Sequence, residues 1–219
     1  MSPGSRSLVA PLALLLLLAL GVGAERVQHR SAAAAAGGRS VGEISASERA
    51  ATFTFDPATA DIDRTAFLTA VAHASPAAQA LIARVDGLVD VRVVVTDAGT
   101  VGTTESRGDR YDVDVNLGLV ARRYGQRGID RTVLHELGHV VDFALVPQAL
   151  DDELDARIPR GFGCEQQSSG ACASQRERFA ESFAKWATGD IGVDLYLGYK
   201  VPPPDDLAAW GAPLARLVG

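Results

Sequence analysis

The stretch Val133–Asp142, VLHELGHVVD, contains two of the four histidines of the chain, with a glutamate between them. Apolar residues around it recur with the spacing of a helix that is apolar on most sides. We therefore expect a largely buried helix that is capped by Asp130 and runs to about Leu145. Because residues four apart on a helix lie one above the other, His135 and His139 should share one face.

Two imidazoles on one helical face can hold a single metal ion, which would satisfy polar groups that are costly to bury unpaired. Glu136 lies about 100° round the helix from His135, near the metal without binding it, where a general base could act on water. Gly138 would let another backbone approach closely. The sequence predicts one Zn²⁺ per chain at His135 and His139. The alternative is a core helix whose histidines only hydrogen-bond to neighbouring groups.

A third metal ligand is expected, because catalytic zinc sites usually have three protein ligands and a water. No histidine follows His139, so the third ligand should be an acid. Candidates in the connecting segments are Asp151, Asp152, Glu153, Asp155 and Glu165. Two further candidates, Glu177 and Glu181, lie four apart in a helix that Ser174 should cap.

Each of these helical acids also has a simpler explanation. Glu177 could complete a capping box with Ser174, and Glu181 could be a solvated charge. Both should lie on the side of the helix away from its apolar stripe, which is formed by Phe179, Phe183 and Trp186. Asp142 could contact a histidine or be an exposed helical charge.

The segments HELGHVVD and ERFAESFA together resemble the gluzincin branch of zinc metallopeptidases, including the catalytic domain of anthrax toxin lethal factor. The resemblance covers roughly Asp130 to Trp186. It implies an α+β, zincin-like fold in which a small twisted sheet accompanies an active-site helix and a second ligand-bearing helix. It also implies that Glu177 is the third zinc ligand and that Glu181 orients a zinc-binding histidine.

One position departs from that resemblance. The lethal factor domain has a tyrosine seven residues before its ligand glutamate that assists the transition state, and this sequence has Gly170 there. A hydrogen-bond donor that stabilises the transition state would have to come from another part of the chain. Tyr196 and Tyr199 are the candidates, and the alternative is that both are ordinary packing residues under the nearby prolines.

The rest of the domain is predicted to contain further helices and a small sheet. Two helices should lie between Asp61 and Asp90, the first capped by Asp63 and the second beginning at Ser75 and Pro76. Their expected buried residues are Phe67, Leu68 and Val71 in the first helix and Leu81, Ile82 and Val85 in the second. A short helix should begin at Asp205. Helices beside a small sheet, without alternation of strands and helices, indicate an α+β fold.

Two strands are predicted between these helices. Val91–Asp97 is rich in β-branched residues, and YDVDVNLGLV (111–120) alternates apolar and polar residues, as in a strand near the edge of a sheet. Residues 100–110 are interpreted as a turn-rich connection between them.

The N-terminal 24 residues have the layout of a secretory signal peptide: Arg6, an apolar stretch from Leu8 to Leu20, and small residues before a cleavage site. An uncleaved membrane anchor is the alternative. Residues 25–50 are rich in Ala and Gly and are interpreted as a flexible lead, and residues 51–219 as the catalytic domain. In an exported chain, Cys164 and Cys172 are expected to form a disulfide.

The formal net charge of −6 and the absence of a basic stripe argue against nucleic acid as a partner. We expect a secreted zinc-dependent endopeptidase that acts on a peptide or protein substrate and has no stable membrane association after signal cleavage. The Tyr111–Asn116 strand could hold an extended peptide by strand addition. The alternative is a secreted binding module on the same scaffold without peptidase activity.

Overall fold

The computed structural model describes residues 52–97, 99–160, 173–192, 195 and 200–219, which belong to one compact unit, Gly42–Gly219. The predicted signal peptide and lead, the Cys164–Cys172 pair, Glu165, Gly170, Tyr196 and Tyr199 lie outside these residues. In the described part of the chain, no helix has the length and apolar character needed to cross a membrane.

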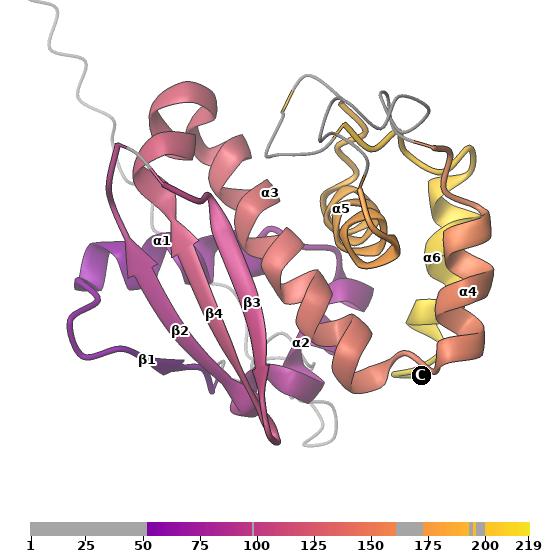
Figure 1. Cartoon of the computed structure of the whole chain (residues 1–219), viewed down its shortest axis with the longest axis horizontal. Coiled ribbons are helices and arrows are strands. Elements are labelled where there is room, and N and C mark those ends of the chain that lie inside the picture. The colour runs from indigo at the N-terminus through magenta and orange to yellow at the C-terminus, as the bar shows by residue number, and fades with distance from the viewer. Residues whose placement is uncertain (1–51, 98, 161–172, 193–194, 196–199) are drawn as a thin grey trace, which may run out of the picture. The chain divides into compact units, whose positions relative to one another are not determined.

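The described residues form six α-helices and one mixed four-stranded sheet, so the predicted α+β class is confirmed (Figure 1). In spatial order the strands are β1 (Thr54–Phe55), β2 (Val89–Val94), β4 (Arg110–Asn116) and β3 (Gly102–Arg107). The first three are parallel, and β3 is antiparallel to β4. The helices are α1 (Asp61–Ala72), α2 (Pro76–Val85), α3 (Leu117–Leu145), α4 (Gln148–Ala156), α5 (Gln175–Thr188) and α6 (Leu207–Ala215).

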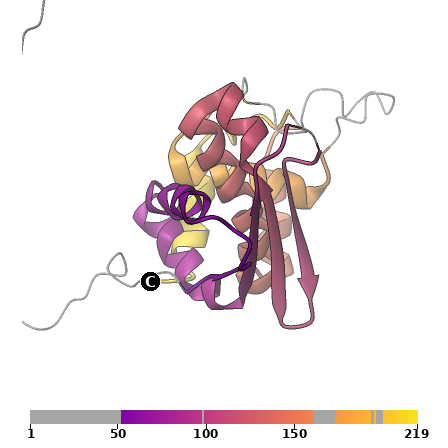
Figure 2. The same cartoon turned by 90° about the vertical axis from the view of Figure 1, so that its left-hand side faces the viewer.

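Helices α1 and α3 pack against one face of the sheet (Figure 2). Alternation along the strands explains this arrangement, because every second side chain points to the same face. The valines of β2 and β4 that face the helices are buried: Val89, Val91, Val93, Val113 and Val115. The opposite face carries charged pairs such as Arg92–Asp114 and Arg110–Asp90.

The prediction of a turn-rich connection at residues 100–110 was wrong. Residues 102–107 form β3, which is one of the two edge strands of the sheet. β4 lies between β2 and β3, so both of its edges are already paired. β3 has little burial on either face, and its sequence therefore lacks the alternation by which strands are recognised. Its pairing with β4 holds it in place.

The beginning of the histidine helix was also predicted wrongly. β4 ends at Asn116, whose side chain accepts a hydrogen bond from the backbone N–H of Gly118 and caps α3. The helix therefore begins 13 residues before Asp130, although Gly125 interrupts it with φ of 59° and ψ of −148°. Asp130 lies inside the helix, where it contacts His73 instead of acting as a cap.

The helices before the sheet agree with the sequence in most respects. Ser75 caps α2 and Pro76 is its first residue, as predicted, and the three apolar residues expected inside α2 are buried. In α1, Phe67 is buried, but Leu68 is exposed and Val71 is only partly buried. Asp63 is not the cap, because α1 begins at Asp61 without a side-chain cap. The strand predicted at 91–97 is β2, which begins and ends earlier.

Helix α5 packs beside α3, and α4 and α6 contact α5 (Figure 1). The close approach of α3 and α5 depends on Gly138. A Cβ atom at this position would lie 3.1 Å from the Cα atom of Ala180 and 3.2 Å from the ring of Phe183. The expectation that Gly138 permits close approach of another backbone is therefore confirmed, and the approaching backbone is that of α5.

Candidate metal centre

Helices α3 and α5 each present a row of polar residues at intervals of four, the spacing that aligns side chains on one helical face. The row on α3 consists of Arg131, His135 and His139, and the row on α5 consists of Glu177, Glu181 and Lys185. The two rows lie side by side and run antiparallel. Glu177 contacts both histidines, and Glu181 contacts His135 and Arg131.

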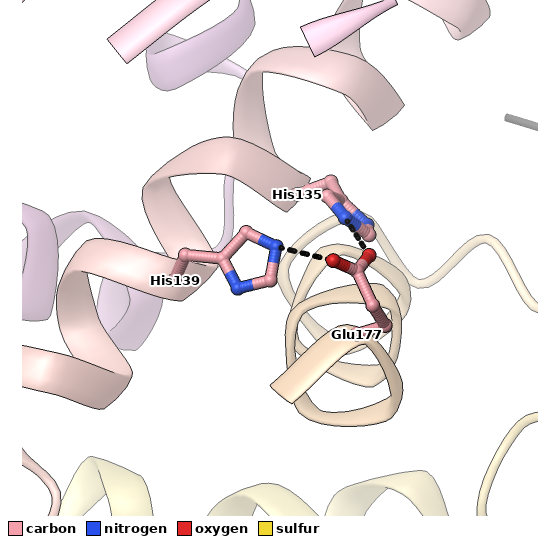
Figure 3. Close-up of side chains that lie close together, drawn as sticks. All are labelled: His135, His139 and Glu177. Atoms are coloured by element: carbon pink, nitrogen blue, oxygen red, sulfur yellow. Dashed lines mark hydrogen bonds and ion pairs between the residues drawn. The ribbon is translucent and has the colours of Figure 1, made fainter. Parts of the chain in front are cut away.

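Glu177 reaches across from α5 to both histidines of α3 (Figure 3). Its Oε2 atom lies 3.2 Å from Nε2 of His135, and its Oε1 atom lies 3.6 Å from Nε2 of His139. One ligand atom from each of the three residues lies within 4.8 Å of the others, so the group could hold a metal ion. Two imidazole nitrogens and one carboxylate oxygen are ligands that suit Zn²⁺.

The position of Glu177 also decides between the two explanations for this residue. The Ser174 side chain accepts a hydrogen bond from the backbone N–H of Glu177, so the predicted cap is confirmed. The Glu177 carboxylate, however, contacts the histidines. The residue therefore contributes its backbone to the cap and its side chain to the candidate metal centre.

The charges of the centre are strongly coupled. Burial alone would lower the pKa of His135, but hydrogen bonds to Glu177 and Glu181, and the charge of Glu136, raise it to about 10. Burial would raise the pKa of Glu177, but its contacts with the two histidines hold it well below the usual value. Without a metal ion, the centre therefore holds a proton on His135 between two carboxylates.

Glu181 is almost completely buried, with 4% of its surface exposed, so the alternative of a solvated charge is wrong. Its Oε2 atom lies 3.3 Å from Nδ1 of His135, and its Oε1 atom accepts hydrogen bonds of 2.7 Å from both Arg131 and Lys185. Burial opposes ionisation of this carboxyl, but His135 and the two cations lower its pKa. The contact with His135 fixes that ring, as the resemblance implied.

Arg131 and Lys185 are the two residues of this cluster that the sequence analysis missed. Each is 1% exposed. Lys185 also donates to the carbonyl of Val201, and Arg131 to the carbonyl of Asp190, so the cluster ties α3 and α5 to the segment that follows. The spacing in the sequence could have identified both residues, because Arg131 lies four positions before His135 and Lys185 four positions after Glu181.

We expect the Lys185→Met substitution to lower the free energy of unfolding by roughly 1–3 kcal/mol. Methionine fills similar space but removes the donor to two buried acceptors, the carbonyl of Val201 and the Glu181 carboxylate. Urea denaturation measures the change. The matched control is Lys200→Met, because Lys200 is the only other lysine and is exposed. Equal unfolding midpoints for Lys185→Met and the unsubstituted protein would contradict this role.

Glu136 lies beside the metal centre and faces β3. Its Oε2 atom accepts a hydrogen bond of 2.8 Å from the Thr104 hydroxyl. A Cβ atom at Gly102 would lie 2.3 Å from Oε1 of Glu136, so this carboxylate occupies the space that a side chain at Gly102 would take. Thr104 and Gly102 were missed because their segment was not predicted to be a strand. They hold Glu136 at the edge of the sheet.

The remaining predicted acids lie elsewhere. Asp151, Asp152, Glu153 and Asp155 belong to α4. Asp151 accepts a hydrogen bond from Gln175, and Asp155 pairs with Arg178. None of the four joins the group formed by the two histidines and Glu177.

Asp142 is buried, and neither of its two proposed roles is observed. It is not an exposed charge, and in the described part of the chain its side chain has no hydrogen bond to a histidine. Burial and the charge of Asp151 raise its pKa to about 7, against the opposing effect of Arg176.

A cleft of about 610 Å³ opens over the centre. One wall is β3 with the residues just before it, and the floor and opposite wall come from α3 and the first turns of α5. The lining includes His135, Glu136, His139 and Glu177. A ligand that reaches the three candidate metal ligands would therefore also meet Glu136 and the edge of the sheet.

No protein-family model, curated protein or solved structure matches this chain. The functional inference therefore depends on the geometry of the cleft and on the residues that line it.

Proposed function

We propose that this protein is a secreted, zinc-dependent endopeptidase with a zincin-like fold. The observation that carries the proposal is the meeting of Glu177 with His135 and His139, with Glu136 in the same cleft. A structural zinc site is normally closed by four protein ligands, whereas three ligands facing a cleft leave a position open. A glutamate beside that position is needed for hydrolysis but not for a purely structural site.

Zinc at His135, His139 and Glu177 would supply Lewis-acid chemistry, activating a water and polarising the substrate carbonyl. Glu136 would accept the proton of the attacking water and pass it to the departing amine. The Thr104 hydroxyl orients the Glu136 carboxylate by its hydrogen bond to Oε2. Glu181, held by Arg131 and Lys185, fixes the ring of His135 through Nδ1 and leaves Nε2 for the metal.

The free edge of β3 offers a place for an extended peptide, in the role first predicted for β4. The backbone N–H of Asn116 donates to Val101 across the β3–β4 pairing. Because hydrogen-bonded pairs alternate along an antiparallel ladder, Gly102, Thr104 and Ser106 direct their backbone groups to the other edge. A peptide that pairs there would pass beside Glu136 and the metal ligands.

The experiment that tests the proposal is incubation of the purified domain with a library of peptides. We expect cleavage that stops when a chelator removes the metal and returns when zinc is added. Binding of peptides without cleavage, by protein that is fully loaded with zinc, would instead favour a binding module on the same scaffold.

Zinc binding itself should release protons. His135 has a pKa of about 10 in the metal-free centre, so it is protonated at pH 7 and zinc must displace that proton. We expect about one zinc per chain, and an affinity that rises by roughly tenfold per pH unit between pH 6 and 8. Calorimetry in buffers of different ionisation enthalpy measures the protons released.

The matched variants for this measurement are His135→Ala and His73→Ala. His73 is an exposed histidine that pairs with Asp130, so its loss should leave zinc binding unchanged. Loss of His135 should abolish tight binding. Zinc affinity that is independent of pH over this range would show that zinc displaces no proton from His135, whereas tight binding by His135→Ala would show that His135 is not a ligand.

A further inference from the structure

Glutamates outnumber arginines and lysines among the side chains that line the cleft. Among the described residues, four glutamates line it and Arg176 is the only arginine or lysine. The glutamates are Glu105, Glu136, Glu177 and Glu181. Two of them belong to the proposed zinc centre and its support, and Glu136 is the proposed base. Arg176 has no part in that chemistry.

Arg176 is held at one end of the cleft by a row of aromatic rings. Its guanidinium carbon lies 4.9 Å from the centre of the Phe143 ring, a cation–π contact. The Phe143 ring is stacked at 5.9 Å on the ring of His139 and at 6.3 Å on that of Tyr111. Since Phe143 contacts the ring of a proposed ligand, Arg176 lies on the His139 side of the metal centre.

The guanidinium of Arg176 is available to a ligand. Its side chain is exposed, and it forms no ion pair with a described acidic residue, whereas Arg131 and Arg178 are paired. Asp142 and Asp151 act on it only at longer range. Both acids are buried, which favours their neutral forms, so they offset the charge of Arg176 only in part.

We infer that Arg176 binds a carboxylate of the substrate, on the His139 side of the bond that is cleaved. Arginine presents two parallel N–H groups that match a carboxylate, and Phe143 beneath it can pack against the adjoining methylene groups. Glu105 and Glu136 disfavour a carboxylate beside β3, on the other side of the cleft. The inference rests on the proposed peptidase function and adds to it a substrate class, peptides with an acidic group at one defined position.

Two kinds of carboxylate satisfy this geometry, the side chain of Asp or Glu and the α-carboxylate of a peptide end. Quenched fluorescent peptides distinguish them. The two peptides of the first pair differ only in having Glu or Gln beside the cleavage site. The two peptides of the second pair differ only at the C-terminus, which is a free carboxylate or an amide at the same distance from the cleavage site. We expect kcat/KM to be roughly tenfold or more higher for one acidic member, the usual effect of a hydrogen bond to a charged group.

Arg176→Gln should remove this discrimination, lowering kcat/KM for the acidic peptide to about that of its neutral counterpart with the same variant. Arg176→Lys should restore part of it, because the charge returns without the paired N–H groups. The matched control is Arg123→Gln. Arg123 is also an exposed arginine over an aromatic ring, at 5.2 Å from Tyr124, but it does not line the cleft. This control should keep the full preference.

A separate measurement distinguishes failure of this inference from failure of the peptidase proposal. Fluorescence anisotropy measures binding of the same labelled peptides to the zinc-loaded Glu136→Gln variant, with and without Arg176→Gln. The inference is supported if the acidic peptide binds more tightly than the neutral one and Arg176→Gln removes this difference, even if no peptide is cleaved. Cleavage of acidic and neutral peptides with equal efficiency would overturn it and leave the peptidase proposal intact. Equal binding of both peptides without cleavage of either by the unsubstituted protein would overturn both.

Discussion

Replacing Glu177 with alanine is expected to weaken zinc binding by much more than about 100-fold. Loss of a residue that only hydrogen-bonds to a metal ligand usually costs about 10–100-fold in affinity. The substitution leaves only His135 and His139 on the ion and removes the negative charge that faces it. The helix cap should be unaffected. The capping bond from Ser174 uses the backbone N–H of residue 177, which alanine retains. Titration with zinc, monitored by calorimetry, measures the loss.

The comparison variant is Glu181→Ala, which removes a residue from the next position on the same face of α5. It should weaken zinc binding by about 10–100-fold, because His135 loses the partner of its Nδ1 atom. It should also destabilise the fold more than Glu177→Ala does, since Arg131 and Lys185 would remain buried without their shared carboxylate. Tight zinc binding by the Glu177 variant together with its loss in the Glu181 variant would reverse the two assignments.

Replacing Glu136 with glutamine should lower turnover by at least about 10²-fold, the usual scale for losing general-base catalysis. The amide fills the same space beside Gly102 and can still accept a hydrogen bond from Thr104, so zinc content and stability should not change. What it cannot do is accept the proton of the attacking water. Steady-state cleavage of the best library peptide measures the effect.

The matched control is Glu105→Gln, which removes a carboxylate from the lining of the same cleft without touching the metal ligands. It should alter kcat far less than the substitution at Glu136. Cleavage by the Glu136 variant at the unsubstituted rate would mean that another group is the base, and the proposed mechanism would need to be replaced.

The sequence was informative wherever a pattern is local. The cap at Ser174 and the beginning of α2 depend on residues within one turn of each other, and both predictions were confirmed. It failed where pairing across the chain decides the structure. β3 has no fully buried residue, so no apolar alternation marks it, and only its pairing with β4 makes it a strand. Asp130 has the chemistry of a cap, but α3 continues through it.

The sequence by itself determined the two rows of the candidate centre. Spacing of four residues aligns His135 with His139, and Glu177 with Glu181, in any α-helix, because the backbone hydrogen bonds fix 3.6 residues per turn. Only the tertiary structure decided that these rows face each other and that Thr104 reaches Glu136. Those contacts depend on close packing of α3 and α5 at Gly138 and on the pairing of β3 with β4. Local spacing contains no information about either contact.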